Sequence, residues 1–248
     1  MGALQDKTAL VTGGTSGIGL AAARRLADEG AHVYITGRTQ QRVDDAVAEI
    51  GSSATGVVND VSDFTGVGVI AEAVEAGGRG LDVVFANAGG GSFSTLEEIT
   101  VDHYLDTFNR NVGGTLFTLQ RVLPLLNPGA SIILSGSTSA SRGVPAFGVY
   151  AASKAAVRSL GRTLAAELAD RGIRVNTIVP GPVETPGLKG LAPAGGEVEL
   201  LSQLAGDVAM KRLGRPDEIA AAVAFLASDA SSYMTGSELF VDGGDVQV

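Results

Sequence analysis

The chain has 248 residues and carries 27 acidic against 18 basic side chains, a formal net charge of −9. This length suits one α/β domain or at most two small ones, and the acidic balance disfavours nucleic acid as a partner because like charges repel. The absence of cysteine excludes disulfides, thiolate metal sites and a cysteine nucleophile.

Strand-like and helix-like segments alternate along the whole chain. Short apolar runs predict strands at 8–11, 32–36, 55–58, 83–85, 131–134, 174–179 and 238–241. Helical patterns predict helices at 18–29, 43–50, 64–76, 102–126, 149–170 and 216–227. Apolar strands that alternate with helices indicate a parallel sheet covered on both faces, and right-handed crossovers then favour a doubly wound α/β fold.

One stretch departs from this alternation. Residues 181–196 are rich in glycine and proline, with Pro182, Pro186 and Pro193 among them. This composition predicts a mobile loop after the sixth strand, in a position suited to cover a substrate. We therefore expect a single dinucleotide-binding and catalytic domain over 1–248, with a substrate loop at about 181–212.

A glycine-rich turn joins the first strand to the first helix. Gly13 allows a sharp turn, Gly17 allows the backbone to approach a pyrophosphate, and Gly19 allows the helix to pack closely on the sheet. The pyrophosphate would accept hydrogen bonds from the free N–H groups of the helix that begins near Ile18. The alternative is an ordinary turn between a strand and a helix.

The end of the second strand predicts which dinucleotide is bound. An NAD site usually has an acidic residue there, whereas this chain has Arg38, which can pair with a 2′-phosphate. Thr15 and Ser16 could add hydroxyl contacts. We therefore favour NADP(H) over NAD(H), although Arg38 would also suit an exposed loop.

Two further strand ends reach the same edge of the sheet. Asp60 and Val61 follow the third strand, where they would meet the adenine, and Asp60 would equally suit a turn or a helix cap. Asn87, Ala88 and Gly89 end the fourth strand, where glycine leaves room for a ribose.

Tyr150 and Lys154 are four residues apart in a predicted helix, so they share one face. A free phenol has a pKa of about 10, and a neighbouring ammonium is expected to lower that pKa. Tyr150 could then exchange a proton with a carbonyl or alcohol oxygen. Ser137 ends the fifth strand at the edge where ligands bind, although Ser135, Ser139 and Ser141 are rivals that would also satisfy loop backbone.

Asn111 lies inside the long helix predicted at 102–126. A buried asparagine at mid-helix is unfavourable and requires partners. It would support either the main chain or a water that delivers protons to Lys154.

Taken together, these motifs resemble the classical short-chain dehydrogenase/reductase family, and the match extends from Lys7 to Gly244. The resemblance implies a Rossmann-type domain with a seven-stranded parallel sheet and hydride transfer at C4 of a nicotinamide. It implies a homo-oligomer, a dimer or a tetramer. It also implies a catalytic tetrad of Asn111, Ser137, Tyr150 and Lys154. The residues that it implies as nicotinamide contacts are Pro180, Gly181, Val183 and Thr185. Ser137 is preferred over the other serines because it precedes Tyr150 by the family's usual thirteen residues.

The predicted reaction is hydride transfer between NADP(H) and a carbonyl/secondary alcohol pair, with Tyr150 as acid and base. The substrate pocket is predicted to be mostly apolar and lined by Phe93, Val144, Phe147, Leu188 and Leu191. An uncharged or partly apolar carbonyl compound is therefore favoured.

Other functions were compared with the same motifs. A 3-oxoacyl-carrier-protein reductase shares them all, and its acidic carrier would need a basic surface such as Lys189, Lys211, Arg212 and Arg215. An enoyl reductase typically has a wider spacing of its tyrosine and lysine, and a sugar epimerase usually has a longer C-terminal domain. A dinucleotide-binding redox sensor without catalysis would be expected to have a damaged tetrad.

Neither a metal site nor a membrane segment is expected. The two histidines, His32 and His103, have no further ligands at suitable spacing. The longest clearly apolar run, 219–227, is about half of a membrane span, and no targeting pattern precedes the first strand. These observations favour a cytoplasmic protein.

Overall fold

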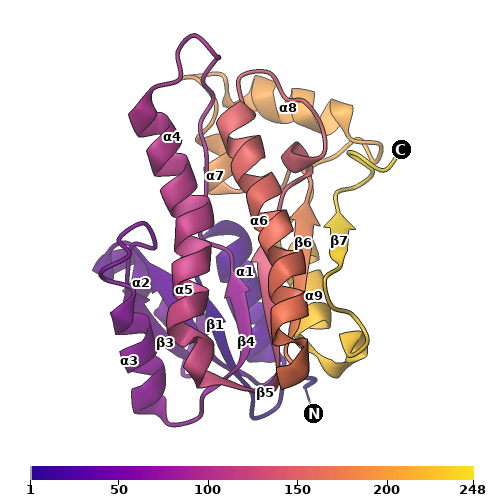
Figure 1. Ribbon diagram of the computed structural model, residues 1–248. Helices are drawn as coiled ribbons and strands as arrows, with labels where there is room; N and C mark the ends of the chain where they lie inside the picture. Colours follow the sequence, from indigo (N-terminus) through magenta and orange to yellow (C-terminus); the bar gives the residue numbers. More distant parts are fainter. Residues whose placement is uncertain (1) are drawn as a thin grey trace.

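The computed structural model describes residues 2–248 and contains one parallel sheet of seven strands (Figure 1). The strand order is β3-β2-β1-β4-β5-β6-β7, so the chain winds outward from β1 in both directions. The strands are β1 (Thr8–Val11), β2 (His32–Gly37), β3 (Ala54–Val58), β4 (Leu81–Ala86), β5 (Leu126–Ser135), β6 (Arg174–Pro180) and β7 (Glu238–Val241). The predicted doubly wound Rossmann-type fold is confirmed.

Helices cover both faces of the sheet. One layer consists of α1 (Gly17–Asp28), α2 (Gln40–Ile50) and α9 (Pro216–Ala227). The other consists of α3 (Gly68–Gly77), α5 (Gly114–Val122) and α6 (Gly148–Leu168), with α4 (Val101–Phe108) extending from α5 beyond the sheet. Short helices η4 (Ala169–Arg171) and η5 (Asp229–Ser231) follow α6 and α9. Within residues 2–248, no helix combines the length and the apolarity that crossing a membrane requires.

The strand sequences explain this double coverage. Successive side chains of a strand point to opposite faces, so a strand buried on both faces must be apolar throughout. In β1, Val11 packs in the α1–α9 layer, whereas its neighbour Leu10 packs in the α3–α5–α6 layer. In β4, Phe85 and Val84 divide in the same way. All four side chains are fully buried.

The predicted helix at 102–126 is interrupted. Between α4 and α5 lies a π-helical turn, η1 (Asn109–Gly113), and a 3-10 turn, η2 (Leu123–Leu125), ends the segment. Strand β5 then begins at Leu126, five residues earlier than predicted. Helix α3 begins later than predicted, because Asp63 accepts hydrogen bonds from the following backbone N–H groups and holds a turn there.

The substrate loop contains regular structure that its glycine and proline content did not indicate. Helix α7 (Pro186–Lys189) begins where the Thr185 hydroxyl accepts a hydrogen bond from Leu188 N at 3.1 Å, and Pro186 occupies its first turn. Helix α8 (Glu197–Asp207) follows. Proline is tolerated at a helix start because no N–H is needed there. Both helices lie beyond the carboxyl ends of the strands (Figure 1), and the mobility of this loop stays a prediction.

Candidate active site

The glycine turn after β1 is shaped for close contact with a ligand. Gly13 and Gly17 adopt φ of 64° and 54°, a region that favours glycine. A Cβ at Gly19 would lie 2.2 Å from the carbonyl oxygen of Gly13, so no side chain fits there. Ser16 precedes α1 without a side-chain cap, which leaves the first N–H groups of α1 available. This turn therefore fits the pyrophosphate of a dinucleotide.

The end of β4 holds the glycine turn in place. Thr12 Oγ1 accepts hydrogen bonds from Asn87 N and Ala88 N, both at 3.0 Å. The Asn87 side chain donates from Nδ2 to the carbonyl oxygen of Thr12 at 3.0 Å. Asn87 is thus placed at the predicted edge, but its amide donates to the protein main chain. Sequence reasoning missed Thr12, whose only signal was a polar residue at the end of a buried strand.

Arg38 follows the last residue of β2, next to the glycine turn. Gly37, which precedes Arg38, packs against Thr15, one of the two residues expected to add hydroxyl contacts. A Cβ at Gly37 would lie 2.4 Å from Thr15 Cγ2. The Arg38 side chain is exposed, and it is close enough to Asp60 to affect the pKa of that carboxyl. Arg38, Thr15 and the end of β3 therefore meet at one place.

Asp60 forms a turn. Its Oδ1 accepts hydrogen bonds from Ser62 N at 3.0 Å and Ser62 Oγ at 2.6 Å. Burial alone would raise the pKa of Asp60, but these hydrogen bonds and the charges of Arg38 and Arg110 hold the pKa below its ordinary value. The Val61 side chain is buried and packs where Gly114 leaves room for it. The structure thus shows the turn, and the contact of Asp60 with the adenine stays a prediction.

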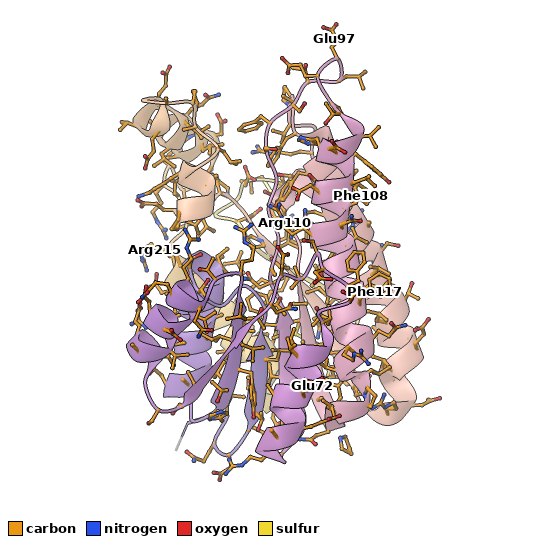
Figure 2. All side chains as sticks on the ribbon, turned by 90° about the vertical axis from the view of Figure 1, so that its left-hand side faces the viewer. Glu72, Glu97, Phe108, Arg110, Phe117 and Arg215 are labelled. Atoms are coloured by element: carbon orange, nitrogen blue, oxygen red, sulfur yellow. The ribbon has the colours of Figure 1, made fainter. Side chains whose placement is uncertain are left out.

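Arg110 was not identified from the sequence. It lies in the π-helical turn and forms two contacts with Asp106, at 2.6 and 2.7 Å. A Cβ at Gly90 would lie 3.6 Å from Arg110 Nη1. Figure 2 shows Arg110 on the side of α4 and α5 that faces the half of the molecule containing Arg215.

Tyr150 and Lys154 lie one turn apart on α6, next to the end of β5. The Lys154 Nζ donates to the carbonyl oxygen of Ser135 at 2.8 Å and lies 5.7 Å from the centroid of the Tyr150 ring. Lys154 is only 4% exposed, and this burial lowers its pKa to about 8. A lysine with a pKa near neutrality, set beside a phenol at a ligand edge, is typical of a functional site.

The phenol itself responds mainly to burial. Burial raises the pKa of Tyr150, and a hydrogen bond with Ser137 acts in the opposite direction. The net lowering of this pKa that the sequence suggested is not found in the structure described, because desolvation of the phenolate outweighs the hydrogen bond with Ser137. Tyr150 therefore retains its proton at neutral pH. Ser137 also accepts from Ser139 N at 3.2 Å, at the start of η3 (Thr138–Ala140).

Asn111 is the centre of a buried hydrogen-bond network. Its Oδ1 accepts from Gly90 N at 2.9 Å, and its Nδ2 donates to the Gly90 carbonyl at 2.9 Å and to Ser153 Oγ at 2.8 Å. Ser153 Oγ in turn donates to the Tyr150 carbonyl at 2.7 Å. Asn111 therefore supports the main chain, one of the two roles considered from the sequence. Ser153 was missed, because a single serine among the alanines of a helix carries no distinct signal.

An aromatic wall adjoins the phenol. The rings of Phe93 and Phe147 lie 4.8 Å apart, and Phe147 stacks on Tyr150 at 4.4 Å with an interplanar angle of 30°. A Cβ at Gly91 would lie 2.6 Å from Tyr150 Cδ2, so Gly91 packs closely against the phenol. Phe147 thus lies against Tyr150 and Phe93 against Phe147, and the substrate contact of all five predicted pocket residues stays a prediction: Phe93, Val144, Phe147, Leu188 and Leu191.

The chain after β6 returns to the glycine turn. Pro180 ends β6, Gly181 N donates to the Val241 carbonyl at 3.2 Å, and Val183 forms a bridge with Gly214. A Cβ at Gly17 would lie 3.2 Å from Thr185 Cγ2. Thr185 therefore lies against the glycine turn, at the same edge of the sheet.

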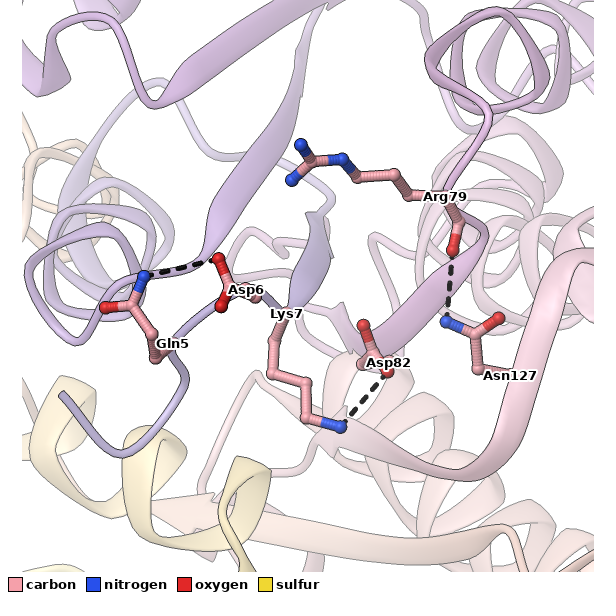
Figure 3. A pocket seen from close by; sticks show the side chains of 6 residues that line it. All are labelled: Gln5, Asp6, Lys7, Arg79, Asp82 and Asn127. Carbon is pink, nitrogen blue, oxygen red and sulfur yellow. Dashed lines mark hydrogen bonds and ion pairs between the residues drawn. The ribbon is translucent and has the colours of Figure 1, made fainter. Parts of the chain in front are cut away.

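A broad cavity of about 550 Å³ lies elsewhere, near the starts of β1, β4 and β5 (Figure 3). Its polar walls include an ion pair of Lys7 with Asp82 at 3.3 Å. It opens at the amino ends of the strands, opposite to the glycine turn. Within residues 2–248, no three His, Cys, Asp or Glu side chains gather where they could hold a metal ion.

Comparisons with known proteins show which family the chain belongs to. A family model described as "Enoyl-(Acyl carrier protein) reductase" matches residues 13–245. "Dehydrogenase/reductase SDR family member 4" of Homo sapiens is 37% identical over 248 residues, which cover 97% of this chain and 88% of that protein. The chain belongs to the short-chain dehydrogenase/reductase family.

Other relatives of this short-chain dehydrogenase/reductase match it over nearly their full length. "Oxidoreductase asL5" of Sarocladium schorii is 44% identical and covers 99% of this chain, with 98% of that protein matched. The solved structure of a "short chain dehydrogenase/reductase family protein" has a TM-score of 0.87 and 40% identity, covering 99% of both chains. A second, described as a proposed betaketoacyl-ACP reductase, has a TM-score of 0.85 and 39% identity, covering 99% of this chain and 100% of its own. The chain is therefore an oxidoreductase of a family that binds NAD(P)(H).

Proposed function

We propose that this protein is an NADP(H)-dependent carbonyl reductase or secondary alcohol dehydrogenase. The observation that carries the proposal is the burial of Lys154 beside Tyr150 at the same strand edge as the uncapped glycine turn. This arrangement would put a proton donor and a dinucleotide site at one edge of the sheet.

Each member of the tetrad has a distinct role in this proposal. When bound, the nicotinamide supplies or accepts a hydride. Tyr150 gives its proton to the carbonyl oxygen, while Ser137 donates a hydrogen bond to that oxygen. Lys154 stabilises the charge that remains on the Tyr150 oxygen, and Asn111 holds the Gly90 backbone and the start of α6 through Ser153.

The preference for NADP(H) is part of the same proposal. The side chain of Arg38 is exposed beside Thr15, and the end of β2 offers no carboxylate to a ribose 2′-hydroxyl. A guanidinium pairs well with a phosphate, so Arg38 supports a 2′-phosphate at this position. NAD(H) is the alternative cofactor.

A panel of ketones, aldehydes and secondary alcohols, assayed with both cofactors by absorbance of the reduced nicotinamide, tests the proposal directly. We expect reduction of uncharged carbonyl compounds with NADPH, because Phe93 and Phe147 form an apolar wall beside Tyr150. No turnover of any carbonyl compound, with either cofactor, would overturn it.

The second candidate is a 3-oxoacyl-carrier-protein reductase, which the description of one solved relative supports. An acidic carrier needs unpaired basic side chains near the cleft. Here Lys189 pairs with Glu184 at 2.9 Å, and Arg212 pairs with Glu218 at 2.7 Å. Arg215 contacts Asp217 at 3.1 Å. These ion pairs favour a free carbonyl compound, and kinetics with a carrier-bound 3-oxoacyl thioester would distinguish the two.

Self-association is also proposed. The outer side of α4 exposes Val101, Tyr104 and Leu105, and Figure 2 shows Phe108 and Phe117 on the side of these helices away from Arg110. Exposed apolar patches of this kind often mark subunit contacts. We expect a dimer or tetramer by light scattering, and Tyr104→Glu should dissociate it. A monomer at micromolar concentration would contradict this.

A non-catalytic redox sensor is the remaining alternative. It is disfavoured because the four tetrad side chains are present and lie at one edge of the sheet.

A further inference from the structure

A buried ion pair joins the C-terminus to the segment that carries Ser137. Arg142 Nη1 lies 2.9 Å from Asp245 Oδ1, and the Asp245 side chain is 0% exposed, whereas that of Arg142 is 35% exposed. Neither Asp245 oxygen completes a hydrogen bond within residues 2–248. The buried carboxylate therefore depends on the Arg142 charge, and this dependence ties two segments that are distant in sequence.

Asp245 belongs to a tight turn, 242–246, which we call the C-terminal turn. Asp242 forms it, because its carboxylate accepts hydrogen bonds from Gly244 N at 2.9 Å and Val246 N at 3.1 Å. Gly243 and Gly244 adopt φ of 62° and 82°, which favours glycine. The turn thus presents the Asp245 carboxylate on a defined backbone.

The C-terminal turn also contacts the substrate loop. The Gly243 carbonyl accepts from Met210 N at 3.1 Å, and a Cβ at Gly243 would lie 2.9 Å from Val208 Cγ1. A Cβ at Gly181 would lie 2.8 Å from the Cα of Asp242. Both ends of the loop that contains α7 and α8 therefore pack on this turn.

The end of the substrate loop has further contacts, because Gly214 N donates to the Pro182 carbonyl at 2.9 Å and Arg212 pairs with Glu218 at 2.7 Å. A cavity of about 110 Å³ lies between Met210, Arg212 and the ends of β6 and β7. Lys211 adopts φ of 53°, which is strained for a residue with a side chain. The contacts with the C-terminal turn act together with these in fixing the position of the loop end.

We propose that the Asp245–Arg142 pair acts as a brace that keeps the Ser137 segment and the substrate loop in a fixed relative position during turnover. Arg142 follows η3, whose N-cap is Ser137, so a displaced Arg142 displaces the hydroxyl that faces Tyr150. Asp245 and Arg142 are positioning residues. Their effect on catalysis rests on the proposed carbonyl reduction, whereas their effect on the two segments does not.

Hydrogen exchange, cofactor titration and kinetics on four variants test the brace. Asp245→Asn should increase amide exchange in both 137–142 and 208–214, lower kcat by about tenfold, and leave the Kd of NADPH unchanged. Arg142→Gln should have the larger effect, since it leaves a buried carboxylate without a counter-charge. The double variant should recover part of that loss. Arg162→Gln, which removes an ion pair to Glu238 outside this region, is the matched control.

Two results would overturn the brace: additive effects of the single variants, or exchange changes confined to 242–248. Arg142→Lys, which keeps the charge and alters its geometry, serves if Arg142→Gln does not fold; it should also increase exchange in both segments, and unchanged exchange there would refute the brace. If the wild-type protein reduces no carbonyl compound, the proposed function fails, while the exchange measurements still decide the brace.

Discussion

Asn111 and Ser153 share a 2.8 Å hydrogen bond that joins the π-helical turn to the helix carrying the phenol. Ser153 Oγ passes this connection to the Tyr150 carbonyl, and the other Asn111 contacts go to the Gly90 backbone. Asn111 and Ser153 are both at most 1% exposed, so neither can substitute water for its partner. The backbone near the cofactor cleft and the start of α6 are thus fixed relative to one another.

Removal of this hydroxyl should weaken the fold and the site together. Ser153→Ala leaves one Asn111 N–H buried without an acceptor, which costs about 1–3 kcal/mol. We expect a corresponding loss in the free energy of unfolding by urea denaturation, with a lower kcat. Ser159→Ala on an exposed position of α6 is the control. Equal stability of the two variants would show that the network is unimportant.

Tyr150→Phe should remove nearly all turnover without removing the cofactor. Loss of a positioned acid typically costs about 10²–10⁴-fold in rate. The phenylalanine ring can keep its stacking on Phe147, so the Kd of NADPH, measured by fluorescence titration, should change little. Tyr104→Phe, on the exposed side of α4, should retain full activity. Substantial activity of Tyr150→Phe would refute the proton-donor role.

The buried lysine predicts a pH dependence of stability. In the folded protein the pKa of Lys154 falls from 10.5 to about 8, so above pH 8 the unfolded chain binds more protons than the folded chain. The contribution of Lys154 to the free energy of unfolding is therefore lowest below pH 8 and rises by roughly 3 kcal/mol toward pH 10.5. Lys154→Met lacks this rise.

Urea denaturation of the cofactor-free protein at several pH values measures this difference. Between pH 8 and 10, the free energy of unfolding of the wild type should increase relative to that of Lys154→Met. The free energy of unfolding of Lys211→Met, a change at an exposed position, should vary with pH as that of the wild type does. Parallel curves for all three proteins would contradict a depressed pKa at Lys154.

Arg38→Asp should move the cofactor preference from NADP toward NAD. A hydrogen bond to a charged group contributes about 1.5–3 kcal/mol, so the ratio of kcat/KM values should change by roughly 10- to 100-fold. Arg79→Asp gives the same change in net charge at the opposite edge of the sheet and should leave the ratio unaltered. An unmoved ratio in Arg38→Asp would show that Arg38 does not select the cofactor.

A methyl group at Gly91 should displace the phenol. The Cβ of Gly91→Ala would lie 2.6 Å from Tyr150 Cδ2, and Phe147 stacks on the same ring and limits its movement. Misplacement of a reacting group by about 1 Å can lower the rate on the order of 10²-fold. Gly143→Ala, where no atom lies within 4 Å of an added Cβ, is the control, and equal kcat values would contradict this packing.

Periodicity and turn chemistry, which are local, predicted the architecture. The seven strands, the helices between them and the glycine turn all follow from apolar runs and from residues at element ends. The four tetrad residues could also be named, because their order and spacing along the chain are characteristic. Helix α7 was missed because its start depends on a cap at Thr185, a signal that glycine and proline content obscured.

The sequence by itself determined the fold class, the family and which residue types meet at the carboxyl edge of the sheet. Only the tertiary structure decided the partners of buried polar groups: Asn111 with Ser153, Asp245 with Arg142, and Thr12 with the end of β4. It also decided the direction of the pKa shifts at Tyr150 and Lys154. Burial and hydrogen bonding between distant segments set these properties, and neither is encoded in local spacing.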